Sequence, residues 1–202
     1  MMNEMRKGML LVVSGASGTG KGTLLERLLK DDPTCAFSVS ATTREPRENE
    51  IPDVHYHFIS DAEYDKLLQE DAFLEHADVH TARYGTLKSE VFDRMERGQN
   101  VVLDIDVQGA LQVMERCPGC VSLFILPPSF AELRRRLEGR GTETQEKIEI
   151  RLRNAREEVK LVDKYQYVIV NDEVDAAVER IKAIVNAEKY RTTRYFPAME
   201  EA

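Results

Sequence analysis

Residues 9–23 read MLLVVSGASGTGKGT, and this stretch decides the fold. Its first five residues form an unbroken apolar run, which is typical of a strand buried on both faces. Residues 15–21 follow with the glycine spacing of a phosphate-binding loop, and residues 23–29 carry leucines at helical spacing. Strand, glycine loop and helix in this order predict backbone N–H groups that surround an anion at a helix N-terminus.

This loop is expected to hold phosphate groups, and Lys21 brings a positive charge to the group being transferred. One position departs from the usual motif, because Gly22 stands where Ser or Thr normally follows the lysine. The nearest hydroxyl comes one residue later, at Thr23. A glycine-rich turn that binds nothing is the alternative. The predicted phosphate-binding residues are Gly15, Ala16, Ser17, Gly18, Thr19, Gly20, Lys21, Gly22 and Thr23.

The composition excludes several classes of protein. The chain has 202 residues and a net charge of −8, which argues against a general nucleic-acid binder. No apolar run approaches the roughly 20 residues that a membrane span needs, and the start, MMNEMRKG, has no secretory apolar region. We therefore expect one cytoplasmic domain that binds neither nucleic acid nor membrane.

Cysteines and histidines suggest two other sites, and we favour neither. Cys117-Pro-Gly-Cys120 has redox or half-zinc spacing, but no second ligand pair is evident, so we interpret it as a turn. His55 and His57 share one face of a predicted strand, without further residues at ligand spacing. We expect surface or packing roles for both.

The rest of the chain predicts an α/β fold, with a mostly parallel sheet flanked by helices. Strands are expected at 36–40, 55–59, 100–106, 121–126 and 168–170. Helices are expected at 64–69, 87–97, 107–116, 133–138, 145–162 and from 174. Residues 38–86 interrupt the alternation and are interpreted as an inserted substrate-holding segment, with a turn at 83–86. Ligands of such sheets bind at the carboxyl ends of the strands, which places the phosphate loop, Ser40, Asp106 and Asn171 along one edge.

Three polar segments have a composition that suits binding or catalysis. Arg44 and Arg47 stand three apart in a polar loop, and guanidinium forks pair well with phosphate oxygens. The strand at 100–106 ends in aspartates, as expected of a strand beside a phosphate loop and its metal. Residues 140–144 are polar and flanked by glycine, which suits a moving lid.

Seven motifs together resemble the bacterial guanylate kinases over essentially the whole chain. They are GASGTGKGT (15–23), SVSATTREPR (38–47), FLEHA (73–77), YGT (84–86), LDIDVQG (103–109), LEGRGTE (137–143) and VIVND (168–172). The resemblance implies a P-loop kinase core at 1–37 and 87–202, a lid at about 138–158 and a GMP-binding segment at about 38–86. It also implies the reaction of ATP and GMP to ADP and GDP with Mg²⁺. Whether the protein forms a homo-oligomer is left open.

The resemblance also implies residue roles. Residues 15–23 would bind ATP, with Asn171 near the adenine, and Thr23 and Asp104 would hold Mg²⁺ directly or through water. The residues implied to hold the GMP phosphate are Arg44, Arg47, Tyr56 and Tyr84. Those implied to read the guanine are Ser40, Glu75, Thr86 and Asp106. Those implied to supply catalytic positive charge are Lys21, Arg44, Arg140 and Arg151.

Elementary chemistry agrees with the implied choice of base. Guanine presents N–H donors at N1 and N2, and the carboxylates of Glu75 and Asp106 can accept them. Adenine would leave buried carboxylates unpaired. Two alternatives stay open: another P-loop kinase, acting for example on a sugar phosphate, and a non-catalytic module that binds phosphopeptides at the monophosphate site.

Overall fold

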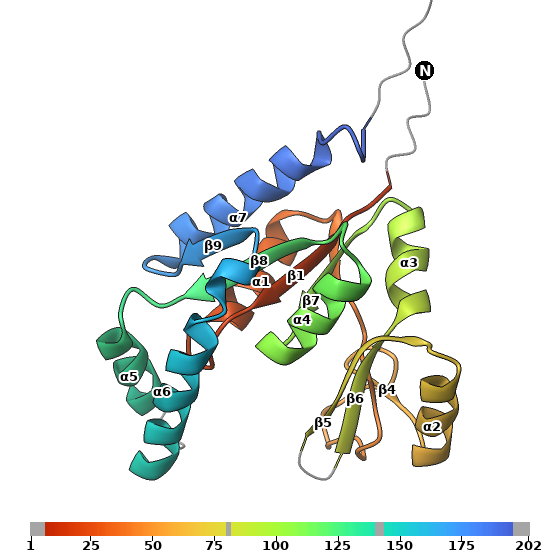
Figure 1. Ribbon diagram of the computed structural model, residues 1–202, viewed down its shortest axis with the longest axis horizontal. Coiled ribbons are helices and arrows are strands. Elements are labelled where there is room, and N and C mark those ends of the chain that lie inside the picture. Colours follow the sequence, from red (N-terminus) through yellow and green to blue (C-terminus); the bar gives the residue numbers. More distant parts are fainter. Residues whose placement is uncertain (1–6, 80–81, 140–143, 196–202) are drawn as a thin grey trace, which may run out of the picture.

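The computed structural model describes residues 7–79, 82–139 and 144–195, and a five-stranded parallel sheet lies at its centre (Figure 1). Every pair of neighbouring strands in this sheet is parallel. The strands in spatial order are β2 (Cys35–Phe37), β7 (Asn100–Asp104), β1 (Leu10–Ser14), β8 (Val121–Leu126) and β9 (Tyr167–Val170). The expected α/β fold with a mostly parallel sheet is confirmed.

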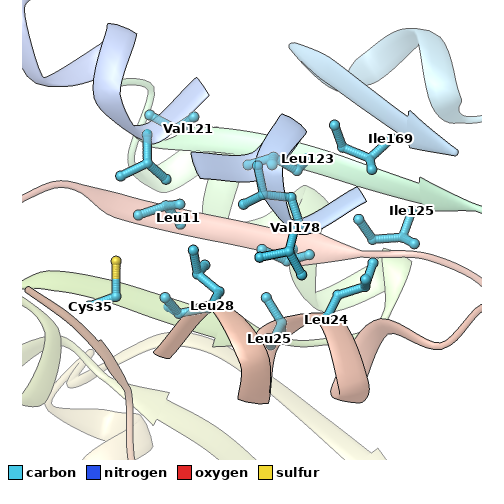
Figure 2. Close-up of a cluster of buried hydrophobic side chains, with 14 of the residues drawn as sticks. Leu11, Leu24, Leu25, Leu28, Cys35, Val121, Leu123, Ile125, Ile169 and Val178 are labelled. Carbon is cyan, nitrogen blue, oxygen red and sulfur yellow. The ribbon is translucent and has the colours of Figure 1, made fainter. Parts of the chain in front are cut away.

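Helices cover both faces of this sheet because successive strand residues point to opposite sides. Leu11 and Val13 of β1 pack with α1 (Lys21–Asp31) and α7 (Val174–Lys189). Leu10 and Val12 pack on the other face, with α3 (Lys88–Glu96) and α4 (Val107–Arg116). Figure 2 shows the leucines of α1 directed at β1 and β8, with Val178 of α7 completing the layer.

A second, smaller sheet is formed by residues 41–87. Its strands in spatial order are β4 (His57–Phe58), β3 (Ala41–Thr42), β6 (Ala82–Leu87) and β5 (Phe73–Val79). Strands β3 and β4 are parallel, and the other two pairs are antiparallel. Helix α2 (Asp61–Gln69) covers this sheet through Tyr64, and the Ser60 side chain caps the helix as expected.

The turn expected at residues 83–86 is wrong, because these residues lie within β6. Gly85 suggested a turn, but it pairs with Ala41 on one side and His76 on the other. A side chain here would collide with the Phe73 ring, since a Cβ atom would lie 2.6 Å from Phe73 Cδ1. This glycine therefore marks a close approach of an aromatic ring to a strand, not a chain reversal.

Helices α5 (Phe130–Gly139) and α6 (Gln145–Val159) pack on each other and form a separate arm. Figure 1 shows this arm and the small sheet projecting from the same end of the core, on opposite sides. Helix α6 ends before the expected residue 162, and the chain passes into the 3₁₀ helix Val162–Lys164. Within the described residues, no helix is long and apolar enough to cross a membrane.

The cysteine segment forms the predicted turn, whereas the strand expected at 55–59 is limited to β4, so His55 lies in a turn and does not share a strand face with His57. The Cys120 N–H donates to the Cys117 carbonyl oxygen at 2.9 Å, which closes the predicted turn, and both thiols are free. His55 accepts a hydrogen bond from the Ile51 N–H, and His57 contacts Asp53.

Candidate active site

The phosphate-binding loop connects β1 to α1 and lines a cleft of about 510 Å³. Gly18 and Gly20 have φ angles of 93° and 87°, a left-handed conformation that glycine adopts without strain. Gly20 is also the N-cap of α1, so the loop leads directly into the positive end of the helix dipole. The cleft is lined by residues 15–23, which are the predicted phosphate-binding residues, together with Glu26, Asp106 and Glu158.

Lys21 is held at the carboxyl end of β7. Its Nζ donates to the Ile105 carbonyl oxygen at 2.9 Å and forms an ion pair with Asp104. The predicted cation and the predicted metal-site carboxylate are therefore direct neighbours. Lys21 also lines the cleft, and these two contacts hold its ammonium group at the end of β7.

The cleft offers oxygen ligands of the type that Mg²⁺ prefers. Thr23 lines the cleft, and Asp104 is exposed and forms an ion pair with Lys21, which lines it too. Mg²⁺ typically takes one or two protein oxygens together with phosphates and water. The described residues contain no group of three His, Cys, Asp or Glu side chains that could hold a metal alone. These residues fit a metal that binds together with a nucleotide. No atom lies within 4 Å of a Cβ at Gly22, so crowding does not explain its departure from the motif.

Two residues from outside the phosphate-binding loop donate hydrogen bonds to its backbone, at the Thr19 carbonyl oxygen. Asn171 is buried after β9, and its Nδ2 donates to the Thr19 carbonyl oxygen at 2.8 Å. Arg136 of α5 donates to the same oxygen at 3.2 Å and to the Asn171 carbonyl oxygen at 3.0 Å. Sequence reasoning missed this use of Arg136, because nothing in the basic run 134–136 distinguishes its third member.

The arm of α5 and α6 also contacts a side chain of the phosphate-binding loop. Arg151 of α6 donates a hydrogen bond from Nη1 to the Ser17 hydroxyl. The other predicted lid arginine, Arg140, lies outside the described residues. Glu158, near the end of the same helix, lines the cleft, and burial raises its pKa, as does the nearby charge of Asp106. None of the sequence motifs contains Glu158, so the sequence analysis did not predict it as a site residue.

Arg44, Tyr56 and Tyr84 come together on the small sheet. Arg44 Nε donates to the Tyr84 hydroxyl at 3.2 Å, and its guanidinium carbon lies 5.1 Å from the centre of the Tyr56 ring. Arg47 is exposed in the same loop. Sequence reasoning missed Glu50, whose carboxylate binds the Arg44 fork through two hydrogen bonds of 2.6 Å. Those bonds lower the pKa of Glu50 to about 2, and they raise the pKa of Arg44 above its usual range.

Glu75 of β5 and Thr86 of β6 form the second predicted group. Glu75 is only 7% exposed, and its Oε1 accepts a hydrogen bond of 2.7 Å from the Thr86 hydroxyl. Burial raises the pKa of Glu75, and the charge of Asp106 raises it further, while the Thr86 hydrogen bond opposes both. Ser40 precedes β3, and its carbonyl oxygen accepts a hydrogen bond from the His57 N–H. Its contact with guanine stays a prediction.

Asp106 lies between the phosphate-binding loop and Glu75. It caps α4 by accepting a hydrogen bond of 2.8 Å from the Gly109 N–H, and it lines the cleft of the phosphate-binding loop. A Cβ at Gly109 would lie 3.0 Å from Glu75 Oε2 and 3.5 Å from Asp106 Oδ1. The two acidic side chains therefore converge on the N-terminus of α4, and the cleft opens beside them.

Known proteins resemble this chain along nearly its full length. A family model described as guanylate kinase matches residues 7–188. The guanylate kinase of Caldanaerobacter subterraneus subsp. tengcongensis is 49% identical, covering 96% of this chain and 94% of that protein. The guanylate kinase of Clostridioides difficile is 46% identical, with coverages of 94% and 93%. The crystal structure of guanylate kinase from Anaplasma phagocytophilum aligns with a TM-score of 0.72 at 34% identity, covering 94% of this chain and 90% of that one.

Proposed function

Since this chain belongs to the guanylate kinase family and is therefore an ATP:GMP phosphotransferase, we propose that the transfer takes place where the phosphate-binding loop meets the small sheet. One observation carries this proposal. Asp106 lies in the loop's cleft and also converges with Glu75 on Gly109. A guanine bound by these two carboxylates would lie next to phosphates bound by the loop, as a direct transfer between two nucleotides requires.

The donor nucleotide, ATP, binds to residues 15–23. Their backbone N–H groups and the N-terminus of α1 face its phosphates, and Lys21 neutralises charge on the transferred group. Asn171 contributes by fixing the Thr19 carbonyl oxygen, so that the loop keeps its shape. Mg²⁺ entering with ATP would neutralise further phosphate charge, with Thr23 and Asp104 as its protein ligands, directly or through water.

The acceptor nucleotide, GMP, binds to the small sheet. Arg44, Arg47, Tyr56 and Tyr84 hold its phosphate by charge and hydrogen bonds. Its base donates N1–H and N2–H to the carboxylates of Glu75 and Asp106, with Ser40 and Thr86 completing the base site. Adenine lacks this pair of donors, so the carboxylate oxygens that face the base would receive no hydrogen bond from it.

The chemical step needs alignment and charge neutralisation more than covalent help from the protein. An oxygen of the GMP phosphate attacks the γ-phosphorus of ATP, the bond to the β,γ-bridging oxygen breaks, and ADP leaves. Lys21, Arg44, Arg140 and Arg151 supply the positive charge around the transferred group. The arm of α5 and α6 acts as the lid, which keeps water from the site when both nucleotides are bound.

An ADP-release assay with ATP and Mg²⁺ tests this proposal when GMP, AMP, CMP and UMP are offered separately. We expect turnover with GMP alone. Lys21→Ala should lower kcat by about 100-fold or more while changing the KM for GMP by less than about threefold, because Lys21 acts on the transferred phosphoryl group. Lys30→Ala, at the exposed end of the same helix, is the matched control and should behave as the wild type.

Other results would change the proposal in defined ways. Turnover with AMP would overturn the roles of Glu75 and Asp106 but keep those of the loop. Unchanged kcat in Lys21→Ala would remove Lys21 from the chemical step. Binding of GMP without turnover of any nucleotide would favour the non-catalytic module.

A further inference from the structure

Most hydrogen-bond donors of the Arg44 side chain are already bound to acceptors within the protein. The guanidinium has five N–H groups, and four of them have acceptors within the described residues. Nε donates to the Tyr84 hydroxyl at 3.2 Å, Nη1 donates to Glu50 and to the Glu45 carbonyl oxygen, and Nη2 donates to Glu50. Two aromatic rings, those of Tyr56 and Phe58, lie 5.1 and 5.7 Å from the guanidinium carbon. Arg44 is thus held in one orientation, and Glu50 makes the strongest of its contacts.

Glu50 is itself anchored to the backbone of the loop that it stabilises. Its Oε2 accepts a hydrogen bond of 2.8 Å from the Arg47 N–H, and its own N–H donates to the Arg47 carbonyl oxygen at 3.0 Å. Its side chain is only 15% exposed. One carboxylate therefore fixes the side chain of Arg44 and the main chain of Arg47, the two arginines of the anion-binding loop.

The remaining contacts of Arg44 would not fix it alone. Stacking on aromatic rings allows a guanidinium to slide. The two hydrogen bonds that remain without Glu50, from Nε to the Tyr84 hydroxyl and from Nη1 to the Glu45 carbonyl oxygen, are longer than those to Glu50 and go to uncharged acceptors. An arginine that must be ordered when its ligand binds loses side-chain freedom at that moment, which weakens binding. A carboxylate that orders it beforehand removes this loss.

We propose that Glu50 is a positioning residue for GMP: it holds Arg44 and the backbone of Arg47 in the arrangement that receives the GMP phosphate, and it stays in place when GMP binds. This inference rests on the proposed placement of that phosphate at Arg44. The opposite role for the same contact is that of a competitor, in which Glu50 occupies the phosphate position and GMP must displace it. The two roles predict changes of opposite sign when the carboxylate is removed.

The test compares Glu50→Gln with Glu48→Gln, which removes the same charge from an exposed position of the same loop. For Glu50→Gln we expect the KM for GMP to rise about tenfold or more, with kcat reduced less than about threefold and the KM for ATP unchanged. Glu48→Gln should match the wild type. The Ki of guanosine, which has no phosphate, should be the same in all three proteins.

An Arg44→Met background separates this inference from the function on which it rests. Arg44→Met should itself raise the KM for GMP, and adding Glu50→Gln should then change it little, because the contact with Arg44 is already lost and the glutamine oxygen can still accept from the Arg47 N–H. If Arg44→Met leaves that KM unchanged, the proposed phosphate site is wrong. If only Glu50→Gln leaves it unchanged or lowers it, the positioning role is wrong and the site stands. A raised guanosine Ki, or unfolding of Glu50→Gln at the assay temperature, would assign Glu50 to the stability of the sheet and overturn the inference.

Discussion

The two sheets of this protein are held together by different forces. The central sheet has apolar side chains on both faces, and its strands β1, β7 and β8 are buried almost throughout. The small sheet has an apolar cluster of only three fully buried residues, Ala41, Tyr64 and Phe73. Polar contacts accompany this cluster, including those of Arg83 with Asp61 and Asp65 and of Arg116 with the Phe73 carbonyl oxygen.

This difference corresponds to two tasks. A phosphate loop serves any nucleotide, and its position depends on a rigid strand and helix that apolar burial provides. A base and a monophosphate must be recognised individually, which requires acids and arginines at fixed places, and these groups contribute little to folding. Stability should therefore depend mainly on the first sheet, and the choice of acceptor nucleotide on the second.

The largest expected difference between the two regions is in the free energy of unfolding that a leucine-to-alanine substitution removes. Leu25 of α1 is 0% exposed in the central core, and Leu68 of α2 is 41% exposed beside the small sheet. Leu25→Ala should lower the free energy of unfolding by about 2–5 kcal/mol, whereas Leu68→Ala should lower it by less than about 1 kcal/mol. Urea unfolding of both variants measures this, and equal losses would contradict the division.

Removing the charge of Glu75 should separate recognition from stability. Glu75→Gln keeps an acceptor for Thr86 but loses the carboxylate, so we expect the KM for GMP to rise about 100-fold. Because the pKa of Glu75 is raised in the folded protein, the folded state binds more protons than the unfolded one above about pH 4.3. The wild type therefore loses stability from this group as pH rises, and the loss is absent where both states are protonated.

The variant should accordingly be more stable than the wild type at pH 7, and this advantage should disappear near pH 4. Thermal unfolding of the two proteins at both pH values measures it. A variant that is less stable than the wild type at pH 7 would show that Glu75 stabilises the sheet, contrary to the comparison.

A smaller effect is expected at Gly109, where the two regions meet. Alanine is the better helix former by up to about 1 kcal/mol, but its Cβ would lie 3.0 Å from Glu75 Oε2 and displace that carboxylate. Gly109→Ala should raise the KM for GMP roughly threefold to tenfold and leave the free energy of unfolding within about 1 kcal/mol of the wild type. Gly119→Ala is the control, since no atom lies within 4 Å of a Cβ there. Equal KM values for the two variants would sink the idea that Gly109 makes room for Glu75.

The sequence allowed accurate prediction wherever structure depends on neighbours along the chain. The apolar run before the loop, the helix at 107–116 and the strand at 121–126 were all predicted, the last two with their observed bounds. The glycine loop was predicted because its function imposes a spacing that few other structures share.

Prediction failed where structure depends on contacts that are distant in sequence. Strand β6 looked like a turn because the reason for Gly85, a Phe73 ring twelve residues earlier, is visible only once the strands pair. Glu50, Arg136 and Glu158 are charged residues on polar segments, where a functional residue and a solvated one have the same local pattern. Only the folded chain shows which partners each of them meets.

The support behind the phosphate-binding loop has a consequence for recombining this enzyme with its relatives. The Thr19 carbonyl oxygen, Arg136 and Asn171 come from three distant parts of the chain, yet they form one hydrogen-bonded group. A chimaera that takes α5 and α6 from another protein inherits that protein's residue at position 136, whereas Thr19 and Asn171 come from the original chain. Crossover points should therefore be chosen so that these three positions descend from one parent, even though no segment of sequence contains them all.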